Sequence, residues 1–573
     1  MRSTRKSETI QLVAAIACIL ATGLLPDMLG SGYWSYSFQF VNILIAVAVA
    51  QNFLLQDANQ VSFGQGAIFG AGAYAAAMAL SLYGLPWIVA FLCATAAGAL
   101  AGLIYALPAL RVQGYYLGFV TLSAGMVFPE LLFTFDSYTN GINGISTPAG
   151  AWKQPLFAGL TPLSLACALA ACAAVAGHLL LRRSPAGRLV RVAGASPESA
   201  QTLGLRPGLI RSIVFCGTCA ATGAAGALYP PIVGFVSPAA FHLELSVLIF
   251  LSVIVGGRGQ VFGPLAGIYL LYLLPNVLLV DLIDYRLLAY GTLALLVMLV
   301  LPDGIVGSFD RGLRRRAGAQ ELDFGLATLP LPAGSPRAGE VAISIRDASK
   351  SFGAVRAIEN VSVEVPAGRI VGLVGANGSG KTSLINAITG FSRLDKGAIS
   401  VFGRPIAGKS PSMIARMGIG RTFQTPRIFD TLSAYENVSV GAEARGIGTG
   451  GDASLEQLRA QLAGADIDII PHGQRRSIEV LRVLQTGAEI ILLDEPAAGL
   501  SHAEREGLQT LLLRLRDEAG RTIVIVEHDL NLVWRVADEV VVMESGRVIA
   551  SGAPAEVARN PQVSKLFVSV SHA

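Results

Sequence analysis

The chain has 573 residues, of which 53% are hydrophobic and 14% are charged, and its formal net charge is +4. Soluble domains usually carry about 25% charged residues, so this composition argues against a wholly soluble protein. The length exceeds that of one ordinary domain, and the small net charge gives no support to nucleic-acid binding.

The apolar residues are concentrated in the first half of the chain. Residues 1–310 contain only two lysines, Lys6 and Lys153, among a succession of long apolar runs. Beyond about residue 340 the composition becomes that of a soluble domain. We therefore expect a transmembrane domain over 1–310, a proline- and glycine-rich linker over 311–340, and a soluble α/β domain over 341–573.

Ten apolar runs approach the ~20 residues that a helix needs to cross a bilayer, except for a shorter run at 243–257. They are residues 10–29, 38–55, 63–82, 86–107, 115–134, 160–181, 209–233, 243–257, 261–283 and 286–302. This pattern predicts an all-α polytopic bundle of about ten transmembrane helices. Eight spans would also place both ends of the bundle on the same side of the membrane, if the closely spaced runs 38–55 and 63–82 do not all cross. A cleaved signal peptide is an alternative for the first run, although no convincing small-residue cleavage site follows it.

The basic residues of the loops predict the orientation of the bundle. With the N-terminus inside, all the following residues fall on the cytoplasmic side: Arg2, Arg5, Lys6, Arg111, Arg182, Arg183, Arg188, Arg191, Arg258, Arg311, Arg314, Arg315 and Arg316. This agrees with the excess of Lys and Arg in cytoplasmic loops. We expect a multi-pass membrane protein with both termini and the soluble domain in the cytoplasm.

Few polar side chains lie within the apolar runs. Glu130 and Glu244, near outer ends of runs, could contact a substrate, but snorkelling to the interface is the favoured interpretation. Four amides could line a pathway or form hydrogen bonds between helices, and the sequence does not decide between these: Asn42, Gln51, Asn52 and Gln65.

A short cytoplasmic helix is predicted in the loop 187–204. Pro197 is suited to a helix start and Gly204 to a helix end. We favour a docking element for the soluble domain over a plain connector, because energy must pass from water to membrane somewhere.

The clearest chemical motif is G-A-N-G-S-G-K-T at 375–382, which fits G-x-x-x-x-G-K-[ST]. It lies between an apolar run at 369–374 and a helical pattern at 383–389, which is the setting of a phosphate-binding loop. Its backbone N–H groups are expected to surround a β-phosphate, together with the N-terminus of the following helix. Lys381 would reach the β- and γ-phosphates, and the Thr382 hydroxyl would bind Mg²⁺. The other expected ATP-binding residues of the loop are Gly375, Asn377, Gly378, Ser379 and Gly380.

Two adjacent acids follow the four apolar residues 490–493. Asp494 at a strand end can hold Mg²⁺, and Glu495 can polarise the attacking water in phosphoryl transfer. Further apolar runs separated by helical stretches predict a mostly parallel buried sheet. The expected strands are 341–345 and 361–365 of a leading sheet, then 369–374, 489–494, 522–526 and 539–543.

The soluble half resembles the nucleotide-binding domains of ABC transporters, because their motifs occur here in the same order along the chain: Phe352, 375–382, Gln424, 470–474, 494–495 and His528. The resemblance implies an α/β P-loop ATPase in which Phe352 stacks on adenine. It implies that Gln424 contacts Mg²⁺ and senses the membrane domain, and that His528 contacts the γ-phosphate. The signature segment, which would close on the ATP of an opposite subunit, comprises Pro471, His472, Gly473 and Gln474.

The stretches 421–424, 436–438, 473–480 and 494–500 resemble the ATPase of branched-chain amino acid (hydrophobic amino acid uptake) importers. The first half resembles the matching permease over 65–74, 107–117, 139–145, 202–205, 223–229 and 256–264. The resemblance implies a permease–ATPase fusion that uses ATP and Mg²⁺ for import across the bacterial inner membrane. It also implies an extracytoplasmic binding protein and either a second permease and a second ATPase subunit or a self-dimer.

Alternatives remain at the level of function. Relatives of this permease type also carry urea, short amides or aromatic acids, and a non-transporting membrane ATPase or an exporter are further options.

Three departures from the family pattern bear on activity. Pro471 replaces the usual serine of the signature, Ser501 replaces a common aspartate, and the region 440–469 is short and interrupted by Gly446, Gly448, Gly450 and Gly451.

Overall fold

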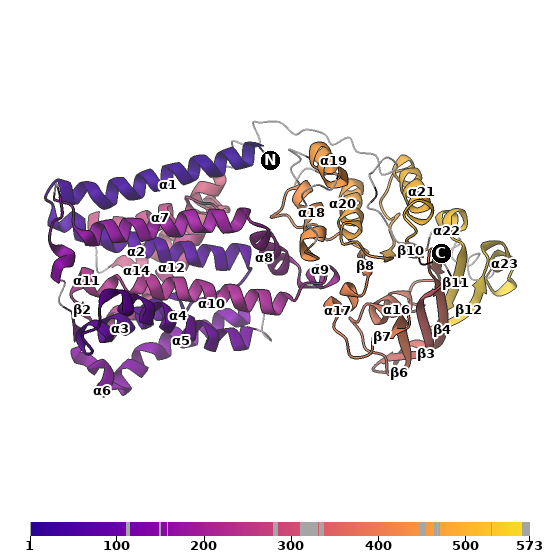
Figure 1. Ribbon diagram of the computed structural model, residues 1–573, viewed down its shortest axis with the longest axis horizontal. Helices are drawn as coiled ribbons and strands as arrows, with labels where there is room; N and C mark the ends of the chain where they lie inside the picture. Colours follow the sequence, from indigo (N-terminus) through magenta and orange to yellow (C-terminus); the bar gives the residue numbers. More distant parts are fainter. Residues whose placement is uncertain are drawn as a thin grey trace. The chain divides into compact units, whose positions relative to one another are not determined.

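The computed structural model describes residues 2–109, 115–147, 150–157, 159–278, 285–309, 331, 337, 339–446, 453–462, 467, 470–528 and 530–563. These residues form two compact units (Figure 1). The helical unit comprises Arg2–Ala195 and Pro207–Gly318. The α/β unit comprises Ser196–Arg206 and Ala319–Ala573, so a short segment of the first half of the chain belongs to it.

The helical unit is built mainly from apolar helices. Its main helices are α1 (Arg2–Met28), α2 (Gly32–Asn52), α3 (Gln65–Ser81), α4 (Trp87–Ala109), α5 (Tyr115–Thr134), α7 (Pro162–Arg183), α8 (Pro185–Ala195), α10 (Pro207–Gly226), α12 (Leu243–Gly256), α13 (Gly263–Ile268) and α14 (Arg286–Val300). Shorter elements are the π-helices η1 (Phe53–Asp57) and η5 (Tyr269–Leu278), the helices α6 (Asp136–Thr139) and α11 (Tyr229–Val233), the 3₁₀ turns η2 (Gly141–Asn143), η3 (Gly150–Lys153) and η4 (Pro238–Phe241), and the paired strands β1 (Ile145–Ser146) and β2 (Phe235–Val236).

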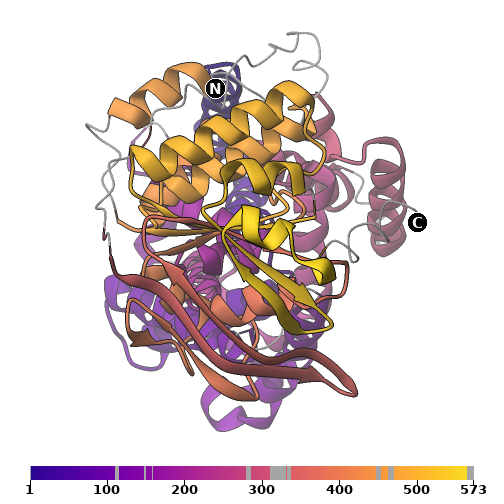
Figure 2. The ribbon, with the colours of Figure 1, turned by 90° about the vertical axis from the view of Figure 1, so that its right-hand side faces the viewer.

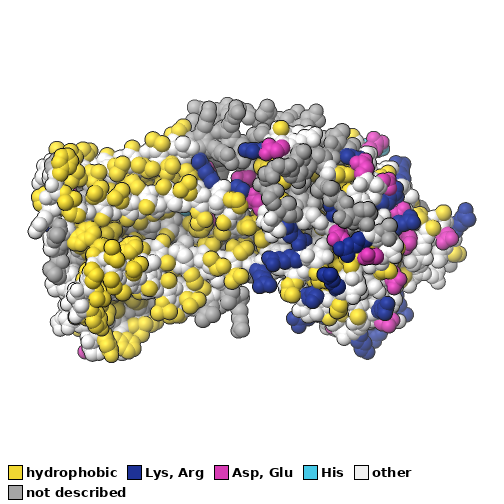
Figure 3. All heavy atoms as spheres, in the orientation of Figure 1, with side chains coloured by type: hydrophobic (Ala, Val, Ile, Leu, Met, Phe, Trp, Pro, Cys, Tyr) yellow, Lys and Arg dark blue, Asp and Glu magenta, His cyan; other side chains and the backbone are white. Residues whose placement is uncertain are grey.

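Each of the ten predicted apolar runs contains helix, and eight helices among the described residues are long and apolar enough to cross a membrane. The other two runs fall short: α3 has 17 residues, and the apolar helix of the ninth run spans Gly263–Pro275. Most side chains of α3 are buried within the unit, unlike those of α4. In Figure 3, apolar side chains cover the visible face of the helical unit. Lys, Arg, Asp and Glu side chains are instead spread over the visible face of the α/β unit. An all-α polytopic membrane bundle is therefore confirmed, with a lower count of long spans.

Small residues let α4 and α10 approach closely. A Cβ atom added to Gly223 of α10 would lie 2.5 Å from the Ala94 carbonyl oxygen and 2.8 Å from the Gly98 Cα of α4. Gly98 in turn approaches the Cys219 carbonyl, where an added Cβ would lie at 2.4 Å. Helices in lipid associate through such backbone contacts because apolar side chains gain little by leaving an apolar solvent.

Most of the buried amides bond between elements. Gln51 Nε2 donates to the Ser62 carbonyl at 3.0 Å, and Gln65 Oε1 accepts from Thr222 Oγ1 at 2.6 Å. Asn52 binds the backbone at Gly259 and Gln260. Gln65 thus bonds between two helices, α3 and α10, whereas Gln51 and Asn52 bond to loop backbone, and buried Asn42 has no hydrogen bond to any described residue. Glu130 and Glu244 are exposed, as the snorkelling interpretation expects.

The α/β unit contains a six-stranded sheet of order β12-β11-β5-β10-β9-β8 (Figure 2). All neighbours in it are parallel except β11 and β12, which confirms the predicted mostly parallel sheet. Its strands are β5 (Ile370–Val374), β8 (Ile419–Arg421), β9 (Ile490–Asp494), β10 (Thr522–Glu527), β11 (Glu539–Glu544) and β12 (Arg547–Gly552). Strands β5, β9 and β10 are buried along their whole length, which explains their continuous apolar sequences.

A second, antiparallel sheet of order β4-β3-β6-β7 contains the two leading strands predicted from sequence. Its strands are β3 (Val341–Phe352), β4 (Val355–Pro366), β6 (Lys396–Val401) and β7 (Arg404–Pro405). Apolar residues of both sheets form one core with α16 (Lys381–Ile388) and α17 (Pro411–Arg416). The opposite face of the six-stranded sheet packs against α18 (Ala434–Ala444), α19 (Ala453–Leu462), α20 (His472–Leu484), α21 (His502–Asp517) and α22 (Leu530–Val536). Helix α23 (Pro554–Ala558) follows β12.

The predicted short helix at Pro197 is present as α9 (Pro197–Thr202) and lies in the α/β unit. The Ser196 hydroxyl caps its N-terminus, and Gly204 follows its end with φ +86°. The Gly204 carbonyl accepts from Arg416 Nε at 2.9 Å, and the Leu205 carbonyl accepts from the Ser412 hydroxyl. These bonds to α17 favour the docking interpretation of the segment.

The short region 440–469 contains the end of α18 and the whole of α19. Gly446 adopts φ +68° just beyond α18. Gly448, Gly450 and Gly451, which were expected to interrupt the region, lie outside the described residues.

We predict that Gly223→Val destabilises the helical unit. Its side chain would meet backbone atoms of α4, which cannot rotate away, so the cost is about 1–3 kcal/mol. Gly217→Val is the matched control, because it lies on the same helix with no atom within 4 Å of an added Cβ. Thermal unfolding of the full chain in detergent should show a lower midpoint for Gly223→Val alone. Equal midpoints for the two variants would contradict the close approach of α4 and α10.

Candidate nucleotide site

The predicted phosphate loop connects β5 to α16, as the motif requires. Gly380, the N-cap of α16, has φ +101°, and an added Cβ would lie 2.2 Å from the Ala357 carbonyl oxygen. Only glycine fits this position, because both the left-handed backbone and the close approach exclude a side chain. The first turn of α16 thereby presents backbone N–H groups and the positive end of the helix to the loop.

Lys381 is buried beside this loop. Its Nζ donates to the carbonyls of Gly375 at 2.8 Å and Ala376 at 3.0 Å, so the side chain folds back over the loop. Burial lowers the pKa of Lys381, and the nearby carboxylates of Glu495 and Asp494 oppose that shift. The ammonium is thus held where phosphate oxygens would replace its carbonyl partners.

Glu495, Gln424 and His528 come together at the end of β9. Gln424 Nε2 donates to Glu495 Oε2 at 3.0 Å, and His528 Nδ1 lies 3.7 Å from Glu495 Oε1. Glu495 has φ +46°, a conformation that costs a non-glycine residue about 1–3 kcal/mol. Its backbone is held in place by a bond from its N–H to the Val526 carbonyl at 2.8 Å. The structure thus joins three residues that the sequence places far apart.

Asp494 is buried beside an arginine that the sequence analysis did not single out as a site residue. Arg421 Nη2 lies 3.6 Å from Asp494 Oδ2, and both side chains are almost fully buried. Burial raises the pKa of Asp494, and the charge of Arg421 opposes that rise. Arg421 Nη1 also donates to Asn386 Oδ1 at 2.7 Å and Thr389 Oγ1 at 2.9 Å in and just after α16. Arg421 therefore links the β9 acid to the helix that follows the phosphate loop.

Phe352 lies at the tip of the β3–β4 hairpin, with 54% of its side chain exposed. The ammonium of Lys350 lies 5.4 Å from the ring centroid. The same hairpin contributes Ala357, whose carbonyl faces Gly380 of the phosphate loop. An exposed aromatic ring on the strand pair beside the loop is suited to stack on a planar base.

The signature residues begin helix α20, and Pro471 is its N-cap without a side-chain hydrogen bond. An added Cβ on Gly473 would lie 2.2 Å from Glu504 Oε1. Glu504 forms a capping box with Ser501, whose hydroxyl and N–H both donate to Glu504 Oε2 at 2.8 Å. Ser501, the residue in place of the common aspartate, therefore caps α21 and holds a carboxylate against the signature segment.

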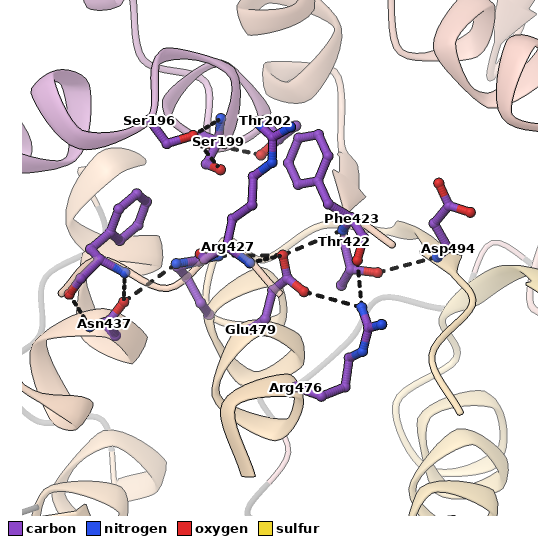
Figure 4. A network of polar contacts seen from close by, with 12 residues as sticks. Ser196, Ser199, Thr202, Thr422, Phe423, Arg427, Asn437, Arg476, Glu479 and Asp494 are labelled. Atoms are coloured by element: carbon purple, nitrogen blue, oxygen red, sulfur yellow. Dashed lines mark hydrogen bonds and ion pairs between the residues drawn. The ribbon is translucent and has the colours of Figure 1, made fainter. Parts of the chain in front are cut away.

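Three buried charged residues of α20 were also missed by the sequence analysis: Arg476, Glu479 and Arg482. They contact the chain around Gln424 and the carbonyl of Glu495 (Figure 4). The signal available in the sequence was an acid between two bases at i, i+3 and i+6, which places all three on one helix face.

Comparison with known proteins gives matches over both halves of the chain. Residues 34–301 match the family described as the permease component of the branched-chain amino acid transport system. Residues 358–498 match the family described as ABC transporter.

The similar proteins are ATP-binding subunits. The high-affinity branched-chain amino acid transport ATP-binding protein BraF of Pseudomonas aeruginosa is 34% identical, over 38% of this chain and 93% of BraF. The corresponding protein LivG of Escherichia coli K12 is 34% identical, over 39% of this chain and 97% of LivG. The solved ADP conformation of MJ1267, an ATP-binding cassette of an ABC transporter, is 29% identical over 40% of this chain, with a TM-score of 0.37.

We predict that Arg421→Ala shifts the pH dependence of ATP hydrolysis. Loss of the guanidinium charge removes the influence that opposes the raised pKa of Asp494, so this pKa rises further. If ionised Asp494 is required, the acidic limb of kcat moves to higher pH. Arg421→Lys keeps a positive charge and should shift the limb less. An unmoved limb in Arg421→Ala would contradict the coupling of these two residues.

Proposed function

This chain belongs to the ABC transporter family, in the branch of branched-chain amino acid transport systems, and we propose that it imports branched-chain amino acids driven by ATP hydrolysis. The observation that supports this most strongly is the union in one chain of a permease of that branch and the assembled Gln424–Glu495–His528 site. BraF and LivG, which are named for branched-chain amino acid transport, are covered almost completely by the second half of the chain.

In the proposed mechanism, ATP would bind at the phosphate loop, water would attack its γ-phosphorus, and the bond from that phosphorus to the β–γ bridging oxygen would break, so that ADP and phosphate leave. The Glu495 carboxylate orients the attacking water and accepts its proton, while the Gln424 amide holds the carboxylate in place through its 3.0 Å hydrogen bond. Lys381 neutralises charge on the β- and γ-phosphates, and His528 contacts the γ-phosphate. Phe352 would stack on adenine, and Gly375, Asn377, Gly378, Ser379 and Gly380 would supply the phosphate cradle.

Mg²⁺ fits the residues present beside this loop. Carboxylate, hydroxyl and amide oxygens are the ligands that Mg²⁺ prefers. Thr382 is the exposed second residue of α16, Asp494 ends β9 next to Glu495 in the chain, and Gln424 is hydrogen-bonded to Glu495. We propose that these three residues hold the ion, which would supply further neutralisation of phosphate charge.

The family architecture supports a proposal for the assembly. We propose that the chain pairs with a second permease and a second ATPase subunit, or with a second copy of itself, and that an extracytoplasmic binding protein delivers the solute. The signature residues Pro471, His472, Gly473 and Gln474 would then complete the ATP site of the other subunit. We further propose domain boundaries at 1–310, 311–340 and 341–573, with both termini and the ATPase domain on the cytoplasmic side of the inner membrane.

The choice of solute can be tested directly. The full chain, with the subunits that copurify with it, is reconstituted in liposomes and supplied with ATP and radiolabelled leucine, urea or an aromatic acid. Leucine accumulation supports the proposal, and accumulation of urea or the aromatic acid replaces the proposed substrate. ATP hydrolysis without accumulation of any solute would favour a non-transporting ATPase.

We predict that Glu495→Gln lowers kcat for ATP hydrolysis by about 10²-fold or more, because it removes the general base. ATP binding should be retained, since the phosphate loop and Lys381 are unchanged. Glu506→Gln, an exposed carboxylate of α21, is the control. Hydrolysis rates and ATP binding are measured on the full chain in lipid nanodiscs. A Glu495→Gln variant that hydrolyses ATP at the control rate would remove Glu495 from the mechanism.

A further inference from the structure

A continuous series of polar contacts leads from the segment 196–206, called the docked segment below, to the backbone carbonyl of Glu495. It begins at Glu198 of α9, which forms an ion pair with Arg427 in the stretch after Gln424. Both side chains are partly exposed, and the Arg427 guanidinium also lies 4.2 Å from the Phe423 ring centroid. The segment that carries Glu198 continues at either end, along the chain, into α8 and α10 of the helical unit.

The backbone of Arg427 is bound to two buried residues of α20. Its N–H donates to Glu479 Oε1 at 3.3 Å, and its carbonyl accepts from Arg482 Nη2 at 2.7 Å. Arg482 Nη2 also lies 3.7 Å from Glu479 Oε1. Movement of Arg427 must therefore either move α20 or break these bonds.

The third residue, Arg476, connects α20 to the catalytic segment. Its guanidinium donates to the carbonyls of Phe423 and Gln424, and to the carbonyl of Glu495 at 3.1 Å. Arg476 Nη1 lies 3.5 Å from Glu479 Oε2, so the carboxylate of Glu479 lies between two arginines. Figure 4 shows Glu479 between the Arg427 backbone and Arg476.

These three side chains are suited to hold a fixed geometry. Each is 1–3% exposed, and Glu479 also accepts from the Phe423 N–H. Burial raises the pKa of Glu479, and the charges of Arg482 and Arg476 oppose the rise. Burial lowers the pKa of Arg482 to about 10, which still leaves it charged at neutral pH. A planar guanidinium can bind several carbonyls at once, which a lysine ammonium on a flexible chain cannot reproduce.

We propose that Arg476, Glu479 and Arg482 form a positioning triad that transmits movement of the docked segment, through Glu198 and Arg427, to the backbone of Gln424 and Glu495. The triad does not touch the nucleotide. It fixes the distance between the two residues whose side chains meet at 3.0 Å and would orient the attacking water. This role rests on the proposed ATP hydrolysis at Glu495.

The first test replaces Arg476 by lysine in the full chain, reconstituted in lipid nanodiscs with the subunits that copurify with it. Arg476→Lys keeps the charge but loses the fork that binds three carbonyls, so kcat for Mg-ATP should fall about tenfold or more with KM within about twofold. Arg521→Lys is the matched control, because Arg521 is a buried arginine whose guanidinium donates to the carbonyls of Gly487 and Ala488. It should lower the thermal unfolding midpoint to a similar extent and leave kcat unchanged.

Equal kcat values for Arg476→Lys and Arg521→Lys would overturn the proposal. A rise in the KM of Arg476→Lys without a fall in its kcat would also overturn it. Absence of hydrolysis by the unmodified chain would instead overturn the proposed function. If Arg476→Lys does not fold, variants of the exposed ion pair between Glu198 and Arg427 test the proposal instead. Glu198→Gln and Arg427→Gln leave the buried triad intact.

The ion-pair test is a double-mutant cycle. Each single variant should lower kcat, and the double variant should be no slower than either single one, since both interrupt the same connection. Arg459→Gln is the control, because Arg459 also pairs with an exposed glutamate, Glu456, and lies 6.0 Å from the Tyr435 ring centroid. Unchanged kcat in the single variants, or effects that add in the double variant, would overturn the transmission through Arg427.

Discussion

The geometry of the nucleotide site depends on a carboxylate enclosed between two arginines. Glu479 lies within 4 Å of Arg476 and Arg482 and is almost inaccessible to water. Removal of one partner from such a group costs about 3–5 kcal/mol, because a buried charge is left without compensation. The guanidinium of Arg476 donates to the carbonyls of Phe423, Gln424 and Glu495, so the backbone at these three residues is bonded to α20.

The membrane half obeys a different constraint, since water-driven burial of apolar groups is not available between helices in lipid. Its helices approach through glycine, as at Gly98 and Gly223, and through the buried amide of Gln65. One short segment within the first half of the chain connects the two halves. The segment 196–206 folds with the α/β unit, while the chain on either side of it continues into α8 and α10 of the helical unit.

Much of this architecture could be predicted because its signals are local. The phosphate loop, the buried strands at 370–374 and 490–494, and α9 between Pro197 and Gly204 each depend on a short run of residues. The span count could not be fixed, because α3 and the helix from Gly263 are apolar yet short, and hydropathy does not separate burial in protein from burial in lipid. Arg421 was missed because its acid, Asp494, is distant in sequence, and the triad of α20 was missed because its charge pattern does not show the distant backbone carbonyls that it binds. A buried charge is recognised only when the fold reveals what neutralises it.

The central claim is that nucleotide chemistry in the second half of the chain drives solute movement through the first half. The most direct measurement is solute concentration inside sealed liposomes that contain the full chain with its copurifying subunits, with ATP supplied to one face at a time. The account predicts accumulation above the external concentration only when ATP reaches the face that carries the ATPase domain. Equal solute levels with and without ATP, or accumulation independent of the face supplied, would contradict it.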